Sequence, residues 1–546
     1  MTILSLKHFK RAAAVALFIC FFNVDAQGAA TAKRFMVVAA HPLAVDAGYS
    51  VLKLGGSAVD AAIAVQAMLG LVEPESSGIG GGAFMLHWSE KEKKLRSYDG
   101  RETAPASARP DRFLKDGKPV EFLDAAVGGQ SVGVPGVLRM LELAHQRHGK
   151  LRWAELFQYA IFAAEEGFPM PLRLHAQLSR ERFLREDAFA KEMYYREGAP
   201  KPVDERLVNR AYGETLRSVG LDGVDAFYRG PIAADIVRAV RSHAKPGDLA
   251  EEDLAAYRAV EREPVCGPYR EWRICSMAPP SSGGLAVLQI LGILERVPFA
   301  RAPPHSPDAV HYFTEAGRLA YADRSRYVGD PDFISVPLKN LLSGSYLDKR
   351  ASLIGGRSMR TAGPGDTEAV GTSHFTVVDA QGDIVSMTTT IESSFGSRIM
   401  VRGFLLNNEL TDFDFTPGSA NQVAPRKRPR SSMAPTIVFK NSIPEAALGS
   451  PGGPFIINYV AKTLVGMLDW RLAIQDAIGL PNFGSRNGPT EIELGTAYEP
   501  LAGVLGGRGH EVSIREMNSG LHGIERVPGG WRGGADPRRE GIARGD

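Results

Sequence analysis

A hydroxyl-rich hairpin in the second half of the chain limits the possible folds more than any other feature. The stretch GTSHFTVVDAQGDIVSMTTT covers residues 371–390. Apolar and polar residues alternate on both sides of a turn at Gln381-Gly382-Asp383, which predicts two antiparallel strands. A polar segment with Gly and Pro but no periodicity, residues 356–371, comes before them and is expected to be an exposed loop or linker. The hairpin therefore places Gly-Thr-Ser at the start of one strand and three threonines at the end of the other.

Helical and strand patterns alternate along the rest of the chain. MVVAAHPLAVDAGYSVLKLGGSAVDAAIAVQ passes from a strand into helices, and Ser57 with Asp60 three residues later predicts a capped helix start. Residues from about 134 to 260 carry mostly helical periodicity, and further strand-and-turn units follow the hairpin. This mixture favours a layered α/β architecture.

The first 26 residues predict export. Lys7, Lys10 and Arg11 come before an apolar core, AAAVALFICFFNV, and small residues end at Ala26. This arrangement is typical of a secretory signal peptide cleaved after Ala26, with a membrane anchor as the alternative. The core is short for a bilayer span, so we expect a periplasmic or secreted protein.

Charge and cysteine content set further limits. The full chain has 64 Lys and Arg against 62 Asp and Glu, and loss of residues 1–26 removes three basic residues and one acidic residue. The remaining charges balance, which gives no indication of a nucleic-acid or anionic-membrane partner. Cys266 and Cys275 flank a Gly-Pro turn. In an exported protein this spacing favours a hairpin disulfide, with two free thiols as the alternative.

Three short patterns point to other chemistries. GIGGGA at residues 78–83 follows a helix and leads into a strand, the reverse of the dinucleotide-binding order, so it predicts a tight turn. GQSVG would make Ser131 a hydrolase nucleophile, but no convincing strand leads into it, which favours a glycine-rich loop. His374 shares a strand face with Thr372, where a histidine more often packs or hydrogen-bonds than catalyses. The histidines show no metal-binding spacing, so no metal is expected.

Thr372 is a candidate nucleophile of a less common kind. A threonine at a chain N-terminus can use its own α-amine as the base, because that amine has a reference pKa of about 7.7–8.0. Thr372 would gain this amine if its hydroxyl attacked the carbonyl of Gly371 and the resulting ester were hydrolysed. A linker, a glycine and a threonine opening a strand fit such self-cleavage, although simple β-propensity produces the same pattern.

Longer motifs follow one another over nearly the whole chain after residue 26. They are EPESSGIGGGAFM, DGRETAP, GVPG, PPSSGG, ADRSRYVGDPDF, GTSHFTVVD, LLNNELTDF, RPRSSMAPTIV and GSPGG. In this order they resemble the γ-glutamyltranspeptidase (glutathione hydrolase) family of N-terminal-nucleophile hydrolases. The resemblance implies an αββα sandwich whose precursor cuts itself between Gly371 and Thr372. A large subunit, residues 27–371, and a small subunit, residues 372–546, would then form one intertwined domain.

The resemblance also implies roles for the reacting groups. Thr372 resembles the family's nucleophile, and Thr390 resembles the second threonine that orients it. The GSPGG turn is similar to an oxyanion hole in which the backbone N–H groups of Gly452 and Gly453 face the tetrahedral oxygen.

Substrate-binding roles follow from the same motifs. A γ-glutamyl group carries an α-carboxylate and an α-ammonium. The resemblance implies that Arg101 pairs with the carboxylate, since a guanidinium suits bidentate pairing. Ser431 and Ser432 would donate to the same carboxylate. Glu409 and Asp412 are similar to the residues that accept from the ammonium.

Two departures from the family pattern bear on specificity. Glu392 stands where many members have Asn, which adds a third acid near the substrate amine and bears on acceptor preference. Only 18 residues separate Asp412 from Ser431, where members with a lid loop have a longer segment. We therefore expect a cleft without a lid, open to larger γ-glutamyl compounds.

The sequence thus predicts a self-processing γ-glutamyl hydrolase and transferase. It would act on glutathione or related compounds without a cofactor and release the γ-glutamyl group to water, an amino acid or a peptide. A glutaryl-type β-lactam side-chain acylase is the enzymatic alternative, but Glu392, Glu409 and Asp412 would then face an uncharged methylene, which is costly. Two further alternatives are an uncleaved binding protein for γ-glutamyl compounds and a serine hydrolase that uses Ser131.

Overall fold

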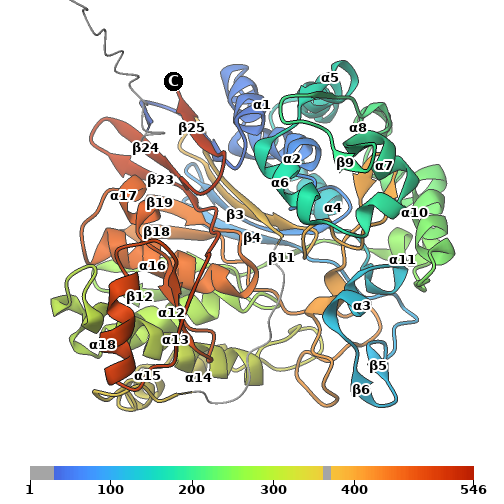
Figure 1. Ribbon diagram of the computed structural model, residues 1–546. Coiled ribbons are helices and arrows are strands. Elements are labelled where there is room, and N and C mark those ends of the chain that lie inside the picture. Colours follow the sequence, from blue (N-terminus) through green and yellow to red (C-terminus); the bar gives the residue numbers. More distant parts are fainter. Residues whose placement is uncertain (1–29, 361–370) are drawn as a thin grey trace, which may run out of the picture.

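Two antiparallel seven-stranded sheets lie face to face, and helices cover both outer sides (Figure 1). This arrangement confirms the predicted αββα sandwich. The structure is a computed structural model that describes residues 30–360 and 371–546. The predicted signal peptide and most of the predicted linker lie outside the described residues.

The hairpin sheet contains the two strands expected from the sequence. Its order is β11 (Val260–Arg262), β4 (Lys94–Gly100), β3 (Gly82–Ser89), β15 (Ile384–Thr390), β14 (Ser373–Val378), β2 (Met36–Ala39) and β25 (Ile542–Gly545). The second sheet has the order β1 (Thr31–Ala32), β24 (Gly530–Ala535), β23 (His522–Val527), β19 (Ile443–Gly449), β18 (Thr436–Lys440), β13 (Trp272–Ser276) and β12 (Val265–Tyr269).

Alternate side chains of each strand serve different layers. Val37 and Ala39 of β2 pack against the helices outside the hairpin sheet, whereas Met36 and Val38 belong to the cluster between the sheets. Because side chains alternate across a strand, one buried strand contributes to two cores. The hairpin strands are accordingly buried along their whole length.

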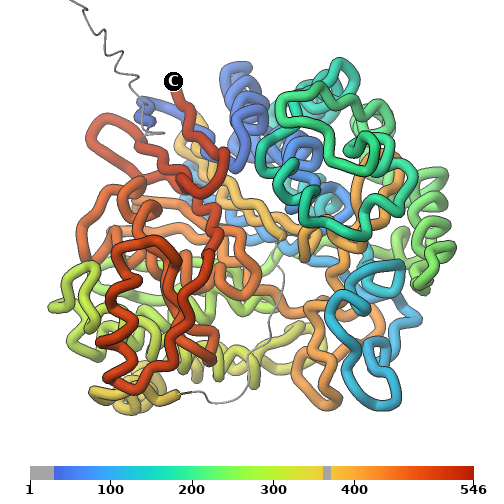
Figure 2. Tube along the Cα trace, viewed as in Figure 1, coloured from blue at the N-terminus to red at the C-terminus, as the bar shows by residue number. Residues whose placement is uncertain are grey.

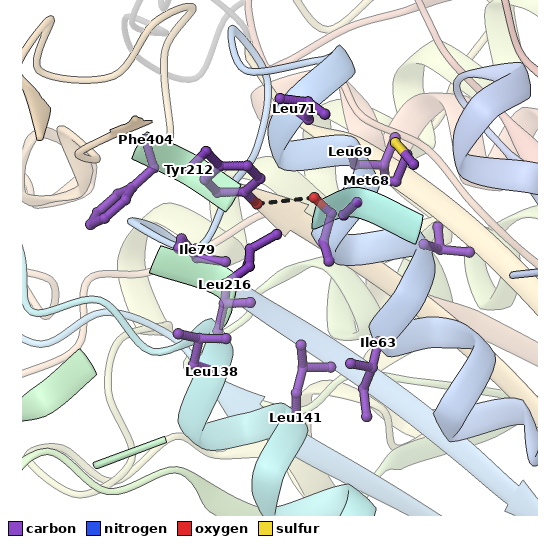
Figure 3. Close-up of a cluster of buried hydrophobic side chains, with 14 of the residues drawn as sticks. Ile63, Met68, Leu69, Leu71, Ile79, Leu138, Leu141, Tyr212, Leu216 and Phe404 are labelled. Atoms are coloured by element: carbon purple, nitrogen blue, oxygen red, sulfur yellow. Dashed lines mark hydrogen bonds between the residues drawn. The ribbon is translucent and has the colours of Figure 1, made fainter. Parts of the chain in front are cut away.

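The helices outside the hairpin sheet form the largest core. They include α1 (Pro42–Lys53), α2 (Ala58–Val72), α4 (Val137–His148), α5 (Gln158–Glu166), α6 (Leu172–Arg180), α7 (Ala188–Tyr194), α8 (Arg210–Asp222), α10 (Gly230–Ser242) and α11 (Glu251–Ala256). Every residue of α2 is buried, and the predicted cap is confirmed, since Ser57 and Asp60 bond to each other's backbone N–H. Figure 3 shows this core, in which the Tyr212 hydroxyl donates to the carbonyl of Ala67 at 3.0 Å.

A second group of helices covers the other sheet. It contains α12 (Gly283–Leu294), α13 (Pro307–Tyr327), α15 (Gly344–Ala351), α16 (Ile456–Leu468), α17 (Ile474–Gly479) and α18 (Ala502–Gly507). The buried helix α12 and the helix α16 pack on apolar residues of β13, β18 and β19. Among the described residues, no helix has both the length and the apolar character needed to cross a membrane.

The hairpin sheet contains strands from before and after Thr372. β15 pairs with β3, β14 pairs with β2, and β2 also pairs with β25 near the end of the chain. The second sheet is mixed in the same way, because β13 pairs with β18 and β1 pairs with β24. The first and last described strands, β1 and β25, also lie close together (Figure 2).

Candidate active site

The end of β15 lies against the Gly371–Thr372 peptide bond. Ser373 pairs with Thr389 in the hairpin, so the next residues outward, Thr372 and Thr390, face each other. Their hydroxyl oxygens are 3.3 Å apart. The Thr390 hydroxyl donates to the carbonyl oxygen of Gly371 at 2.9 Å, and the Thr372 hydroxyl lies 2.6 Å from that oxygen. Two hydroxyl groups thus converge on one carbonyl, which one can polarise while the other approaches its carbon.

Close backbone contacts hold this arrangement together. A β-carbon on residue 371 would lie 2.7 Å from the backbone of Ser393 and Ser394, so only glycine fits there. A β-carbon on Gly81, in the glycine run before β3, would lie 2.0 Å from the carbonyl oxygen of Thr390. The Thr390 hydroxyl also accepts from the backbone N–H of Glu392 at 2.8 Å. This bond leaves the Thr390 proton directed at Gly371.

The other hydroxyls of the hairpin have a structural role. The His374 ring bonds to the hydroxyls of Thr388, at 2.9 Å, and Thr376, at 3.2 Å. Burial holds the pKa of His374 well below its usual range, so the ring is neutral. His374 therefore packs between threonines inside the sandwich, as expected for most such histidines.

A pocket opens over the two threonines. It is lined by Arg101, Thr372, Thr390, Glu392, Glu409, Asp412, Ser431, Ser432, Met433, Gly453, Pro454 and Ile456. Every side chain that the resemblance implied is among these residues, although they come from five separate chain segments. Gly453 begins a short 3-10 turn and has a φ of +52°, and Gly452 just before it has a φ of +136°. Both glycines thus use backbone conformations that other residues rarely adopt.

Arg101 is the positive centre of the pocket. Its guanidinium forms ion pairs with Glu409 and Asp412, and it donates to the carbonyls of Pro429, at 3.1 Å, and Arg430, at 3.0 Å. Its side chain is 1% exposed. Burial alone would lower the pKa of Arg101, but the charges of Glu409 and Asp412 outweigh it and raise the pKa above its ordinary value. Arg101 therefore stays charged and fixes both acids.

Two buried carboxyl groups near Arg101, those of Glu102 and Glu409, have raised pKa values. Burial raises the pKa of Glu409 to about 7, with Arg101 opposing the shift and Asp412 adding to it. Burial and the neighbouring Glu409 raise the pKa of Glu102 well above its usual range. Such neighbouring acids titrate as a group and retain protons near neutral pH. Oε2 of Glu409 accepts no hydrogen bond from any described residue.

Ser432 is oriented by a residue that the sequence argument missed. Arg324 of α13 donates to the Ser432 hydroxyl at 2.8 Å and to the Ser282 hydroxyl at 2.9 Å. Ser282 in turn donates through its backbone N–H to the carbonyl of Ser431 at 2.8 Å. Arg324 belongs to the ADRSRYVGDPDF motif, and this motif is the sequence signal that could have indicated its role. One guanidinium thus connects two loops and occupies an acceptor site of Ser432, so the Ser432 proton remains to be donated elsewhere.

The segment between Asp412 and Ser431 bonds to itself. Arg430 forms an ion pair with Asp414 at 2.8 Å, and Asn421 donates to the carbonyl of Asp412 at 2.6 Å.

Met433, Pro454 and Ile456 form the apolar part of the pocket lining. The pocket therefore combines a charged region around Arg101 with an apolar wall.

Other sequence candidates lie apart from the pocket. The Ser131 hydroxyl donates to the carbonyls of Ala126, at 2.7 Å, and Gly128, at 2.9 Å, inside a buried turn. Cys266 and Cys275 face each other in paired strands β12 and β13 and are joined by a disulfide bond. His311, Glu315 and His510 could in principle surround a metal ion, but the two histidines bond to each other at 2.8 Å and Glu315 accepts from Ser358 and Arg318.

Comparison with known proteins identifies the family of the chain. Residues 44–545 match the family model described as Gamma-glutamyltranspeptidase. The chain is 37% identical over 540 residues to a glutathione hydrolase proenzyme of Bacillus subtilis (strain 168), covering 94% of this chain and 92% of the relative. It is 36% identical to the Acylase ACY 1 proenzyme of Pseudomonas sp. (strain SE83), covering 93% and 92%. The solved cephalosporin acylase of Bacillus halodurans superimposes with a TM-score of 0.85 at 27% identity, covering 100% and 99% of the two chains. Over nearly its whole described length, the chain therefore belongs to the γ-glutamyltranspeptidase family.

Proposed function

We propose that this enzyme is an exported, self-processing γ-glutamyl hydrolase and transferase with Thr372 as its nucleophile. One observation carries the proposal: the hydroxyls of Thr372 and Thr390 both lie on the Gly371 carbonyl, at the mouth of a pocket with Arg101 and three acids. The proposal gives residues 27–371 and 372–546 as the two mature subunits. Export rests on the sequence of residues 1–26 alone.

Self-cleavage follows from this arrangement. The Thr372 hydroxyl oxygen attacks the Gly371 carbonyl carbon, whose oxygen accepts from Thr390. The C–N bond breaks, the hydroxyl proton passes to the departing nitrogen, and an ester joins Gly371 to the Thr372 oxygen. Water then hydrolyses the ester to the Gly371 carboxylate and a free Thr372 hydroxyl. Thr372 becomes an N-terminal residue with an α-amine of its own.

The same hydroxyl would then act on substrate. The α-amine takes its proton as the hydroxyl attacks the γ-carbonyl of a γ-glutamyl amide, and the proton passes to the leaving amine. The γ-glutamyl ester is released to water, which gives glutamate, or to an amino acid or peptide, which gives a new amide. Backbone N–H groups of Gly452 and Gly453 are proposed to stabilise the tetrahedral oxygen. No metal or organic cofactor enters either step.

Recognition of the γ-glutamyl group is proposed to use the charged region of the pocket. Oε2 of Glu409, which accepts no hydrogen bond from any described residue, is proposed to accept from the substrate ammonium together with Asp412 and Glu392. The carboxylate would meet the charge of Arg101 and the hydroxyls of Ser431 and Ser432. Glutathione offers both groups on one carbon, as do related γ-glutamyl compounds. The short segment after Asp412 is proposed to leave room for larger ones.

A glutaryl-type acylase is the second candidate, because acylases are among the similar proteins. A glutaryl group has a carboxylate but no ammonium. Binding it would place Glu392, Glu409 and Asp412 beside an uncharged methylene. It would also add a carboxylate around Arg101 without an ammonium to balance the charge, which is unfavourable. The three acids therefore favour the γ-glutamyl substrate.

Two measurements test the proposal. Purified protein is run on a denaturing gel, and the N-terminus of the small fragment is sequenced; Thr-Ser-His-Phe is expected, and the fragment is expected to be absent in Thr372→Ala. The processed enzyme is then compared on γ-glutamyl and glutaryl anilides, with γ-glutamyl expected to react faster. An uncut chain with full amidase activity would overturn the mechanism, and a preference for the glutaryl anilide would make it an acylase.

A further inference from the structure

The side of Thr372 that faces away from the pocket contacts a buried arginine. Arg539, between β24 and β25, donates from Nη1 to the carbonyl oxygen of Thr372 at 3.2 Å and from Nε to the carbonyl of Ser519 at 3.0 Å. Its residue is 6% exposed. The guanidinium thus lies directly behind the proposed nucleophile, and the chemistry of the pocket assigns it no role.

Ser373 is held from the same side. Its hydroxyl donates to Oε2 of Glu73 at 2.7 Å and accepts from the Ser77 hydroxyl at 3.3 Å. Arg173 of α6 lies 3.7 Å from Oε1 of Glu73 and 3.3 Å from Oε1 of Glu75. We call Glu73, Glu75, Arg173 and Arg539 the back cluster. Its members come from both sides of the proposed cleavage site. The sheet that joins these two parts would keep the cluster assembled after the cut.

The back cluster is net positive near neutral pH. Burial raises the pKa of Glu75 to about 8, with Glu73 adding to the shift, so Glu75 holds its proton at pH 7. Burial and the charge of Arg173 lower the pKa of Arg539 to about 10, which still leaves it charged. Within the back cluster, two guanidinium groups therefore face one charged carboxylate, and the carboxylates of Asp536 and Glu540 lie beside the cluster.

We propose that Arg539 is a positioning residue that fixes residue 372 through its carbonyl and, by its positive charge, keeps the α-amine freed by cleavage unprotonated. The inference rests on the proposed function, because only a cleaved chain has that amine. Cleavage removes the covalent anchor on one side of residue 372. The bonds from Arg539 to its carbonyl and from Ser373 to Glu73 then hold it beside Thr390.

The sign of the electrostatic effect follows from the charges around residue 372. On the pocket side lie Arg101, Glu392, Glu409 and Asp412. On the opposite side lie His41, Glu73, Glu75, Arg173, Asp536, Arg539 and Glu540, and on the strand face lie His374 and His522. The pocket acids favour a protonated amine, which cannot act as base. A cation behind the residue opposes them, because a nearby positive charge lowers the pKa of an amine.

The test is the pH dependence of kcat/KM for the processed enzyme on a γ-glutamyl anilide. Arg539→Gln is expected to move the acidic limb to higher pH by on the order of one unit. Arg539→Lys keeps the charge and should leave the limb near the wild-type position. Glu73→Gln removes a negative charge, still accepts from Ser373, and should move the limb to lower pH. Arg544→Gln, which loses a surface pairing with Asp46, is the matched control.

The outcomes separate the two proposals. If the wild-type chain is not cut before Thr372, the proposed function fails before any variant is made. If it is cut, an unmoved limb in Arg539→Gln, or an equal loss of activity at every pH, overturns the electrostatic role. If Arg539→Gln does not fold or is not cut, Glu73→Gln decides: a shift to lower pH supports the inference, and an unchanged or raised limb sinks it.

Discussion

Arg101 and Arg539 are both buried and lie on opposite sides of Thr372, yet their surroundings shift their pKa values in opposite directions. Arg101 touches the carboxylates of Glu409 and Asp412, which raise its pKa in spite of burial. Arg539 instead donates to the carbonyls of Thr372 and Ser519, and burial lowers its pKa to about 10. The difference teaches that direct contact with a counter-ion, more than burial, decides how a buried guanidinium behaves.

The largest expected effect on activity comes from replacing Thr372, the residue that lies between the two arginines. Thr372→Ala should leave the chain uncut and lower activity on a γ-glutamyl anilide by about a thousandfold or more, since no other group supplies the nucleophile. A denaturing gel and a rate assay measure both. Thr388→Ala, which changes a threonine of the neighbouring strand β15 that bonds to His374, is the control and should still be cut. Full activity in Thr372→Ala would show that Thr372 is not the nucleophile, and the two arginines could then not be compared as neighbours of the reacting residue.

The next effect tests the paired arginine. Arg101→Lys keeps the charge, but one ammonium cannot reproduce the separate contacts to Glu409 and Asp412. We expect kcat/KM to fall by about a hundredfold, equivalent to about 3 kcal/mol. Arg139→Lys also disturbs an arginine between two acids, Glu142 and Asp225, but this arginine does not line the pocket, so the change should alter kcat/KM little. Equal effects in the two variants would show that Arg101 acts only as a structural ion pair.

A smaller effect on kinetics is expected for Arg324, which contacts Ser432 rather than the proposed substrate. Arg324→Gln removes the donor that orients Ser432 and should raise KM about tenfold with less change in kcat, because ground-state binding weakens first. Steady-state kinetics on a γ-glutamyl anilide give both constants. Arg326→Gln, two residues along the same helix, is the control. A fall in kcat with KM unchanged would place Arg324 in the chemical step instead.

The last expected effect concerns folding stability on the side of Arg539, not catalysis. The pKa of Glu75 is raised above its unfolded value, so its favourable contribution exists at low pH and is lost as pH rises toward about 8. Glu75→Gln has no such loss. In an uncut Thr372→Ala background, the Gln variant should gain one to a few kcal/mol over its parent between pH 5 and pH 8, roughly, in urea unfolding. An equal free-energy difference at both pH values would refute the shift.

The sequence predicted those parts of the site that depend on local pattern. Alternation in the hairpin set the register, and the register alone places Thr372 opposite Thr390. The capped start at Ser57 followed from three residues of sequence. The family motifs supplied Arg101, Glu409, Asp412 and the two serines, which no periodicity could have brought together.

Arg324 and Arg539 could not be predicted in this way. Arg539 lies 167 residues from the carbonyl that it contacts, and Arg324 lies 108 residues from Ser432. Their roles depend on which chain segments the two sheets bring together. From the sequence alone, a charged residue near the end of the chain, such as Arg539, would be predicted to lie on the surface. The sequence could not show how available Arg101 is to a substrate carboxylate, because that depends on its ion pairs with Glu409 and Asp412.

Each sheet contains strands from both sides of residue 372, which has a consequence for the proposed cut. A break before Thr372 would sever the backbone without dividing the core, since β14 remains hydrogen-bonded between β15 and β2, and β25 still closes the edge beside β2. The two pieces could part only by dismantling both sheets. Proteolytic maturation would then act as a nick in one cooperative unit, and the mature enzyme would tolerate dilution as a single chain does.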